Sequence, residues 1–163
     1  MSSNKNEKIR IIEKKIQFCS FYIADHLFGV NILDVKEIKD EVSITNVFHA
    51  PKEIKGFINI RGNVHLVLDI RLMLGFNKKK IDDLSRVVLF KQNIGPSFGI
   101  LVDSISDMVV ANENNIEELG NKNIINIDHN NFEIIKGICK LENELLLIIE
   151  TKKLLEAVNK DNV

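Results

Sequence analysis

The sequence predicts an all-β fold of two small β-barrels packed side by side, with short helical turns and one C-terminal helix. The chain is a series of short runs rich in Ile, Val, Leu and Phe, each bounded by Gly, Asn, Asp or Pro. This pattern is typical of short strands joined by turns. Two parts of it recur in the same order further along the chain, which indicates a duplicated plan. The length of 163 residues and hydrophobic share of 45% are enough for a core without disulfide or metal staples.

The strands follow a polar beginning. Residues 1–14 are charged and aperiodic, so we expect a mobile lead-in to a single domain over residues 15–157. Strands are predicted wherever an apolar run is bounded by turn residues. The ten predicted strands are 15–23, 27–31, 42–48, 56–60, 64–69, 86–91, 97–102, 104–110, 134–141 and 144–150.

Three short segments are predicted to be helical. Short helical turns fit residues 32–38 and 70–74. A true helix fits residues 151–158, because Thr151 is a suitable N-cap. Leu154, Leu155 and Val158 then lie on one face of that helix, which predicts that it packs against the core.

The internal repeat has two parts. Residues 28–38 align with 98–108, sharing a Phe-Gly pair and the apolar positions after it, and residues 56–75 align with 137–156. The halves would span about 15–80 and 81–157, and a groove would lie between the two barrels. A chance likeness of two β-hairpins is the alternative. Matched residues include Ile32 with Val102, Val35 with Ile105, Glu37 with Asp107, Ile38 with Met108, Leu66 with Leu147, Asp69 with Glu150, and Arg71 with Lys152.

Gly62 and Asn143 occupy equivalent places in the repeat. Each falls between two predicted strands, where a tight hairpin turn is required. Both residue types tolerate a left-handed backbone, which such turns demand. We therefore predict that Gly62 and Asn143 are structural turn residues.

The composition excludes several partners. The net charge is −1, and the chain has one Tyr and no Trp, so neither an electrostatic field nor stacking aromatics would attract nucleic acid. The N-terminus is polar and resembles no signal peptide. The longest apolar run, residues 145–149, is too short to insert into a membrane. A cytoplasmic location follows as an expectation.

The reactive side chains form no recognisable catalytic, cofactor or metal site. Cys19 and Cys139 stand in predicted strands without CxxC spacing, so we expect small buried thiols, with a disulfide or a reactive thiol as alternatives. The four histidines lack ligand spacing, and we interpret them as turn or edge residues. Nucleotide-binding and nucleophile-elbow motifs are absent from the sequence. Carboxylates that follow apolar runs are expected to cap backbone amides: Asp34, Asp69, Asp103 and Asp107.

One polar residue stands out in the apolar hairpin of residues 56–69. Arg61 directly precedes the turn residue Gly62, where its guanidinium is expected to be partly enclosed and to need a carboxylate partner. Glu37, the lone acid in the apolar run near the first helical turn, is the predicted partner. A solvated surface cation is the alternative.

At these segments the sequence resembles the CheW family of chemotaxis coupling proteins. The family pattern combines Gly-Ile/Val-Asp-Ile-Leu-x-Val-x-Glu-Ile with Ala-Pro, Gly-Val-Ile-Asn-Leu-Arg-Gly and Asp-Leu-Arg. This chain matches it at residues 29–38, 50–51, 56–62 and 69–71, and residues 99–108 resemble the family's second Gly-hydrophobic-Val-Asp segment. The resemblance covers about residues 15–157, nearly the whole chain.

The resemblance implies two SH3-like five-stranded barrels, with strands that can cross between the halves. It also implies a non-catalytic scaffold, without cofactors, in a two-component signalling system. The scaffold would couple the cytoplasmic tips of chemoreceptors (methyl-accepting chemotaxis proteins) to the regulatory domain of the histidine kinase CheA. It would be monomeric alone and part of receptor–kinase arrays beneath the inner membrane. Four residues match positions that the family associates with receptor coupling: Val35, Glu37, Gly56 and Arg61.

The chain departs from the family pattern at a few places. Phe48 and Leu66 stand where the family usually has proline, and Asn31 replaces an aspartate. These departures bear on partner specificity more than on fold. There are two alternatives: a CheW-like module of a CheA- or CheV-type protein, and an enzyme of unrecognised type. The initial Met1 and a chain that ends soon after the last helix favour a free-standing protein over the module.

Overall fold

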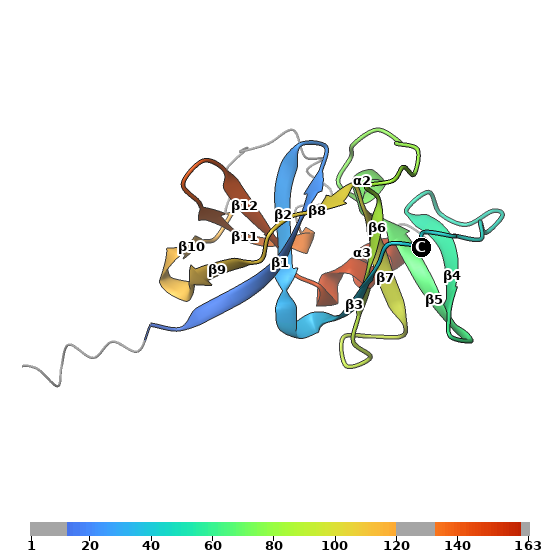
Figure 1. Ribbon diagram of the computed structural model, residues 1–163, viewed down its shortest axis with the longest axis horizontal. Coiled ribbons are helices and arrows are strands. Elements are labelled where there is room, and N and C mark those ends of the chain that lie inside the picture. The colour runs from blue at the N-terminus through green and yellow to red at the C-terminus, as the bar shows by residue number, and fades with distance from the viewer. Residues whose placement is uncertain (1–12, 120–132, 161–163) are drawn as a thin grey trace, which may run out of the picture.

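The computed structural model describes residues 13–119 and 133–160, and it is mainly β (Figure 1). Residues 1–12 of the expected lead-in lie outside the described residues. The elements in chain order are β1 (Lys15–Ile23), β2 (His26–Asn31), η1 (Ile32–Asp34), β3 (Val35–Lys39), β4 (Ile54–Ile60), β5 (Asn63–Asp69), α2 (Ile70–Met73), β6 (Arg86–Phe90), β7 (Phe98–Val102), β8 (Ser104–Ile105), β9 (Val109–Asn112), η2 (Glu113–Asn115), β10 (Ile116–Glu117), β11 (Ile135–Lys140), β12 (Leu145–Ile149) and α3 (Lys152–Lys160).

The strands form two sheets, and each sheet takes strands from both halves of the chain. One sheet has the order β10-β11-β12-β2-β1-β8, with β9 also paired to β1, and the other has the order β3-β6-β7-β5-β4. Each contains one parallel pair, β2 with β12 and β5 with β7, among antiparallel neighbours. The sheets lie side by side in Figure 1. The prediction of a mainly β fold with two β subdomains is confirmed, whereas a boundary near residue 80 stays a prediction.

The strand pairing reproduces the repeat residue by residue. In the parallel pairs Phe28 lies opposite Leu147, and Phe98 lies opposite Leu66. The alignment matches Phe28 with Phe98 and Leu147 with Leu66, so the two pairs are equivalent. The hairpins β4–β5 and β11–β12 also share their register, because Phe57 pairs with Leu66 as Ile138 pairs with Leu147. Both hairpins also have a register shift just before these residues, between Ile54 and Gly56 and between Ile135 and Gly137.

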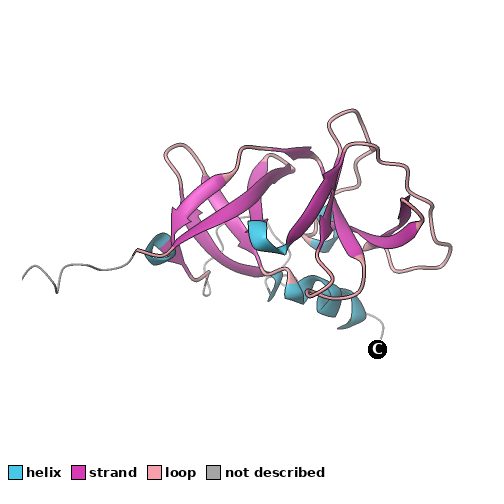
Figure 2. Ribbon diagram, turned by 60° about the horizontal axis from the view of Figure 1, so that its bottom comes forward, coloured by secondary structure: helices cyan, strands magenta, loops and turns pink. Residues whose placement is uncertain are grey.

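Three hydrophobic clusters account for the arrangement of the sheets. Each sheet wraps around a small cluster of its own, one containing Phe18 and Leu146 and the other containing Val67 and Val87. The largest cluster lies between the sheets and includes buried side chains of both sheets and of α3. Figure 2 shows α3 along one side of the strands. The two β subdomains therefore share a core, which is why they form one compact unit.

Three local predictions were wrong, and one short strand was missed. Residues 42–48 form no strand but a loop with a single bridge, from Thr45 to Phe57 of β4. The helical turn expected over 32–38 stops after η1, and β3 follows because residues 35–39 pair with β6. The strand expected over 104–110 is interrupted between β8 and β9, and β10 was not predicted. Tertiary pairing decided the structure of these short segments, where local propensity is weak.

Both cysteines are free and buried, as predicted. Cys19 belongs to the cluster between the sheets and Cys139 to the interior of one sheet. Burial raises the pKa of both thiols, because the charged thiolate loses its hydration. Within the described ranges, no helix is both long and apolar enough to cross a membrane.

Candidate functional site

The β4–β5 hairpin ends in a two-residue turn made by Arg61 and Gly62. Ile60 pairs with Asn63 across the turn, and the φ angles are 49° at Arg61 and 82° at Gly62. Positive φ at both central residues matches the twist of a hairpin. The Asn59 side chain accepts a hydrogen bond of 3.0 Å from the Gly62 N–H. Arg61 thus adopts an uncommon left-handed backbone, which places its side chain at the tip of the hairpin.

Asn143 lies in the equivalent loop, between β11 and β12, but that loop turns differently. Lys140 pairs with Leu145, and the Leu141 N–H donates to the Glu144 carbonyl at 2.9 Å. Asn143 is not among the described residues with positive φ. The left-handed backbone expected for Asn143 is therefore not observed, because four residues make this turn instead of two.

Arg61 and Glu37 form an ion pair between the hairpin tip and β3. The Arg61 Nη2 donates to the Glu37 Oε1 at 2.8 Å. The exposed fractions of the side chains are 69% for Arg61 and 25% for Glu37. The predicted partner of Arg61 is confirmed, but the predicted enclosure of its guanidinium is wrong, because the hairpin tip projects into solvent. The pair joins two strands at opposite edges of one sheet.

The other two residues carried over from the family differ in environment. Val35 begins β3 opposite Phe90 and is half-buried against the core between the sheets. Gly56 is buried in β4, and a Cβ atom there would lie 2.1 Å from the Thr45 carbonyl oxygen. Gly56 therefore offers no side-chain surface to a partner. It allows the 42–46 segment to approach β4 closely.

His65 lies in the same sheet and was not recognised from the sequence. It was interpreted as a turn or edge residue, yet it is only 4% exposed in the middle of β5, opposite Ile58. Its Nδ1 atom is buried without a hydrogen-bond partner. Burial lowers the pKa of His65, and the nearby cations Lys36 and Arg61 lower it further against the opposing effect of Glu37. Side chains of a strand alternate between its two faces, which puts His65 on the same face of β5 as the apolar Val67. This alternation could have predicted the burial of His65.

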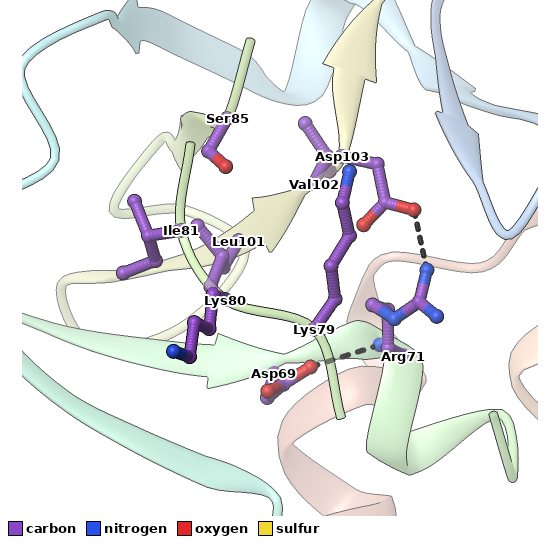
Figure 3. A pocket seen from close by; sticks show the side chains of 9 residues that line it. All are labelled: Asp69, Arg71, Lys79, Lys80, Ile81, Ser85, Leu101, Val102 and Asp103. Carbon is purple, nitrogen blue, oxygen red and sulfur yellow. Dashed lines mark hydrogen bonds and ion pairs between the residues drawn. The ribbon is translucent and has the colours of Figure 1, made fainter. Parts of the chain in front are cut away.

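A second polar cluster joins the two sheets (Figure 3). Asp103, which follows β7, accepts hydrogen bonds from the Ala24 N–H at 2.9 Å and from Arg71 Nη1 at 2.5 Å. Arg71 also donates through Nε to the Asn77 carbonyl at 2.8 Å. Ala24 belongs to the β1–β2 turn of one sheet, whereas Arg71 lies in α2, which follows β5 of the other sheet. The cluster therefore fastens one hairpin to the opposite sheet.

Asp69 lies in the same shallow pocket and caps α2. Its Oδ1 accepts from the N–H groups of Arg71 at 3.1 Å and of Leu72 at 3.4 Å, as the sequence predicted for a carboxylate after an apolar run. The residue is 4% exposed, and burial raises the pKa of its carboxyl. Asp69 and Asp103 are each engaged in holding the backbone. Among the described residues, no group of three or more His, Cys, Asp or Glu could hold a metal ion.

The equivalent position in the other sheet, after its parallel pair β2 and β12, is built differently. The alignment puts Lys152 opposite Arg71 and Leu33 opposite Asp103. Lys152 is exposed and Leu33 is 69% exposed. The Arg71–Asp103 bridge thus belongs to one subdomain only, which makes the junction between the sheets asymmetric.

Comparisons with known proteins agree on the family. Residues 17–159 match the model of the CheW-like domain. The chain is 26% identical to the chemotaxis protein CheW of Helicobacter pylori, over 88% of this chain and 84% of that protein. It is 28% identical to CheW of Rhizobium meliloti, over 82% and 83%. The crystal structure of the scaffolding protein TtCheW from Thermoanaerobacter tengcongensis superposes with a TM-score of 0.73 and 29% identity, over 84% of this chain and 90% of that one.

The sequence match extends over almost all of both subdomains, and the solved scaffold has the same fold. The pattern residues quoted from the sequence, including the Asn-x-Arg-Gly turn and the Val-Asp segment after β7, all lie in the matched region. The chain therefore belongs to the CheW family of chemotaxis scaffold proteins.

Proposed function

We propose that this chain is a cytoplasmic, non-catalytic adaptor that couples chemoreceptor tips to the regulatory domain of the histidine kinase CheA. The observation that carries the proposal is the Glu37–Arg61 ion pair. It lies at an exposed hairpin tip, on residues that match the family's receptor-coupling positions. The family resemblance supplies the identity of both partners. An adaptor of this kind needs surface complementarity and no reacting group.

The surroundings of the ion pair suit a helical partner. Ile38, next to Glu37 on β3, is 39% exposed, and Val64, three residues after Arg61, is 58% exposed. The side chains of Ile38 and Glu37 lie on opposite faces of β3. The exposed apolar positions would therefore border the contact, and the charged pair would fix the register of a helix. We therefore propose Glu37 and Arg61 as direct contacts to the receptor. Val35 and Gly56 would act from beneath, by holding β3 and β4 in place.

Replacing Arg61 by alanine is expected to weaken receptor binding while the fold survives. The pair is largely exposed, so its loss should change the free energy of unfolding by about 0–1 kcal/mol. An interface arginine can contribute about 2 kcal/mol to binding, roughly a thirtyfold loss of affinity when it is truncated. Thermal unfolding and calorimetric titration with a receptor-tip fragment measure the two effects separately.

Lys140→Ala is the matched control. Lys140 lies in the sheet that does not carry Arg61. It is 74% exposed and pairs with Glu117 of the same sheet at 3.9 Å. Its loss should leave receptor affinity unchanged, and binding of the CheA regulatory domain should persist in Arg61→Ala. Equal receptor affinity in Arg61→Ala and the unmodified chain would place the receptor surface elsewhere. Unfolding of Arg61→Ala would show that the arginine is structural.

A further inference from the structure

His65 is a buried ionisable group in the subdomain that carries the Glu37–Arg61 pair. Its side chain is on the interior face of β5, which also presents Val67. Ile58 lies opposite it on β4. At 4% exposure its Nδ1 has no hydrogen-bond partner. An imidazole in this setting is accommodated as a neutral ring, since a buried charge without a partner is costly.

The charged groups that act on His65 come from two elements other than its own strand. Lys36 and Glu37 are neighbours on β3, and Arg61 is at the tip of the β4–β5 hairpin. Two of these three form the ion pair at 2.8 Å. The apolar residues in the interior of this sheet include Ile58, Ile60 and Val67. Glu37 pairs with Leu89 and His65 pairs with Ile58, and both partners belong to the same interior cluster. Directly paired residues share a face of a sheet, so Glu37 and the imidazole lie on the same face of one sheet.

We propose that His65 is a pH-sensitive group in the sheet that carries the Glu37–Arg61 pair, and that protonation of its imidazole disrupts this pair and weakens receptor binding. The inference rests on the proposed receptor-coupling role of the pair. A neutral imidazole does not compete with Arg61 for the Glu37 carboxylate. An imidazolium would compete with Arg61 for the same carboxylate and would repel both Arg61 and Lys36.

The direction of the pH dependence follows from the pKa of His65, which is lowered by burial and by the adjacent cations. The unfolded chain then takes up this proton at a higher pH than the folded chain does. The contribution of His65 to the free energy of unfolding is fully present above the ordinary histidine pKa of about 6.5. It falls as the pH drops from there towards the lowered pKa. Receptor binding selects the neutral form, so acidification should weaken it in the same direction.

The test compares receptor binding at two pH values in the unmodified chain and in two variants. Affinity for a receptor-tip fragment should fall by a few-fold between pH 7.5 and pH 5.5 in the unmodified chain, short of the roughly tenfold that an ordinary histidine pKa of about 6.5 would give. His65→Leu and His65→Gln cannot take up the proton, so the fall should be less than about twofold in whichever of them folds. The affinity for the CheA regulatory domain, measured in parallel, should show no His65-dependent change with pH.

A second measurement on the unmodified chain needs no partner. In NMR titrations the signals of the His65 ring carbon and of the Arg61 Nε–H should change with the same midpoint. A titration of His65 that leaves the Arg61 signal unchanged would overturn the proposal. So would a loss of affinity between pH 7.5 and pH 5.5 that is as large in the His65 variants as in the unmodified chain. Absence of receptor binding at pH 7.5 in every protein would instead contradict the proposed function, and the NMR result would still decide the role of His65.

Discussion

Gly56→Ala is expected to lower the free energy of unfolding by about 3 kcal/mol, through overpacking and backbone strain together. The new Cβ atom would lie 2.1 Å from the Thr45 carbonyl oxygen and 2.8 Å from Ile44 Cγ2. Backbone cannot yield as a flexible side chain does, so the 42–46 segment must leave β4. Its two hydrogen bonds with Phe57, of 2.8 and 2.9 Å, would be lost with it. Urea denaturation measures the change.

Gly62→Ala separates the steric effect from the backbone effect. Both glycines have positive φ, 151° at Gly56 and 82° at Gly62, but a Cβ at Gly62 would meet no atom within 4 Å. The control should therefore cost only the left-handed penalty, about 1 kcal/mol, with the branched Gly62→Val at about 1–3 kcal/mol. If Gly56→Ala is no more destabilising than Gly62→Ala, the close approach of Thr45 to β4 is not a constraint on the fold.

Asp103→Ala should destabilise the protein by about 3 kcal/mol, because it leaves two groups without their acceptor. Arg71 is 16% exposed and would keep its charge without Asp103, while the Ala24 N–H in the β1–β2 turn would lose its hydrogen bond. The contact between that turn and α2 depends on both interactions. Urea denaturation monitored by circular dichroism gives the free energy of unfolding.

Lys79→Ala is the control for this pocket. Lys79 lines the same pocket (Figure 3) and pairs with Asp82 at 3.2 Å, but the two side chains are 38% and 46% exposed. An exposed pair of this kind contributes about 0–1 kcal/mol. A loss of stability in Asp103→Ala as small as that in Lys79→Ala would mean that the Arg71–Asp103 bridge does not fasten the sheets together.

The sequence was sufficient to predict most of the strands and the repeat. Aligned residues such as Phe28 and Phe98 occupy equivalent positions in the parallel pairs, because a strand's alternation and its turn residues are local properties. The exchange of strands between the sheets is a long-range property that the residues do not encode locally. The same reason explains why 42–48 was predicted to be a strand, although only Thr45 finds a pairing partner.

The candidate site was predictable only in part. The pairing of Arg61 with Glu37 followed from the need of a guanidinium for a carboxylate. The exposure of Arg61, the burial of Gly56 and the burial of His65 depend on how the hairpin sits in its sheet. A lone histidine among apolar residues is ambiguous in sequence, since imidazole occurs both inside proteins and at their surface.

Assembly of a three-component complex tests the adaptor role most directly. Vesicles or lattices carrying a receptor cytoplasmic fragment are mixed with CheA and sedimented, with and without this chain. We expect the chain to raise the amount of CheA recovered with the receptor by about tenfold and Arg61→Ala to abolish most of that gain. Recovery of CheA that is the same with and without the chain, while the chain itself is folded, would contradict the adaptor role.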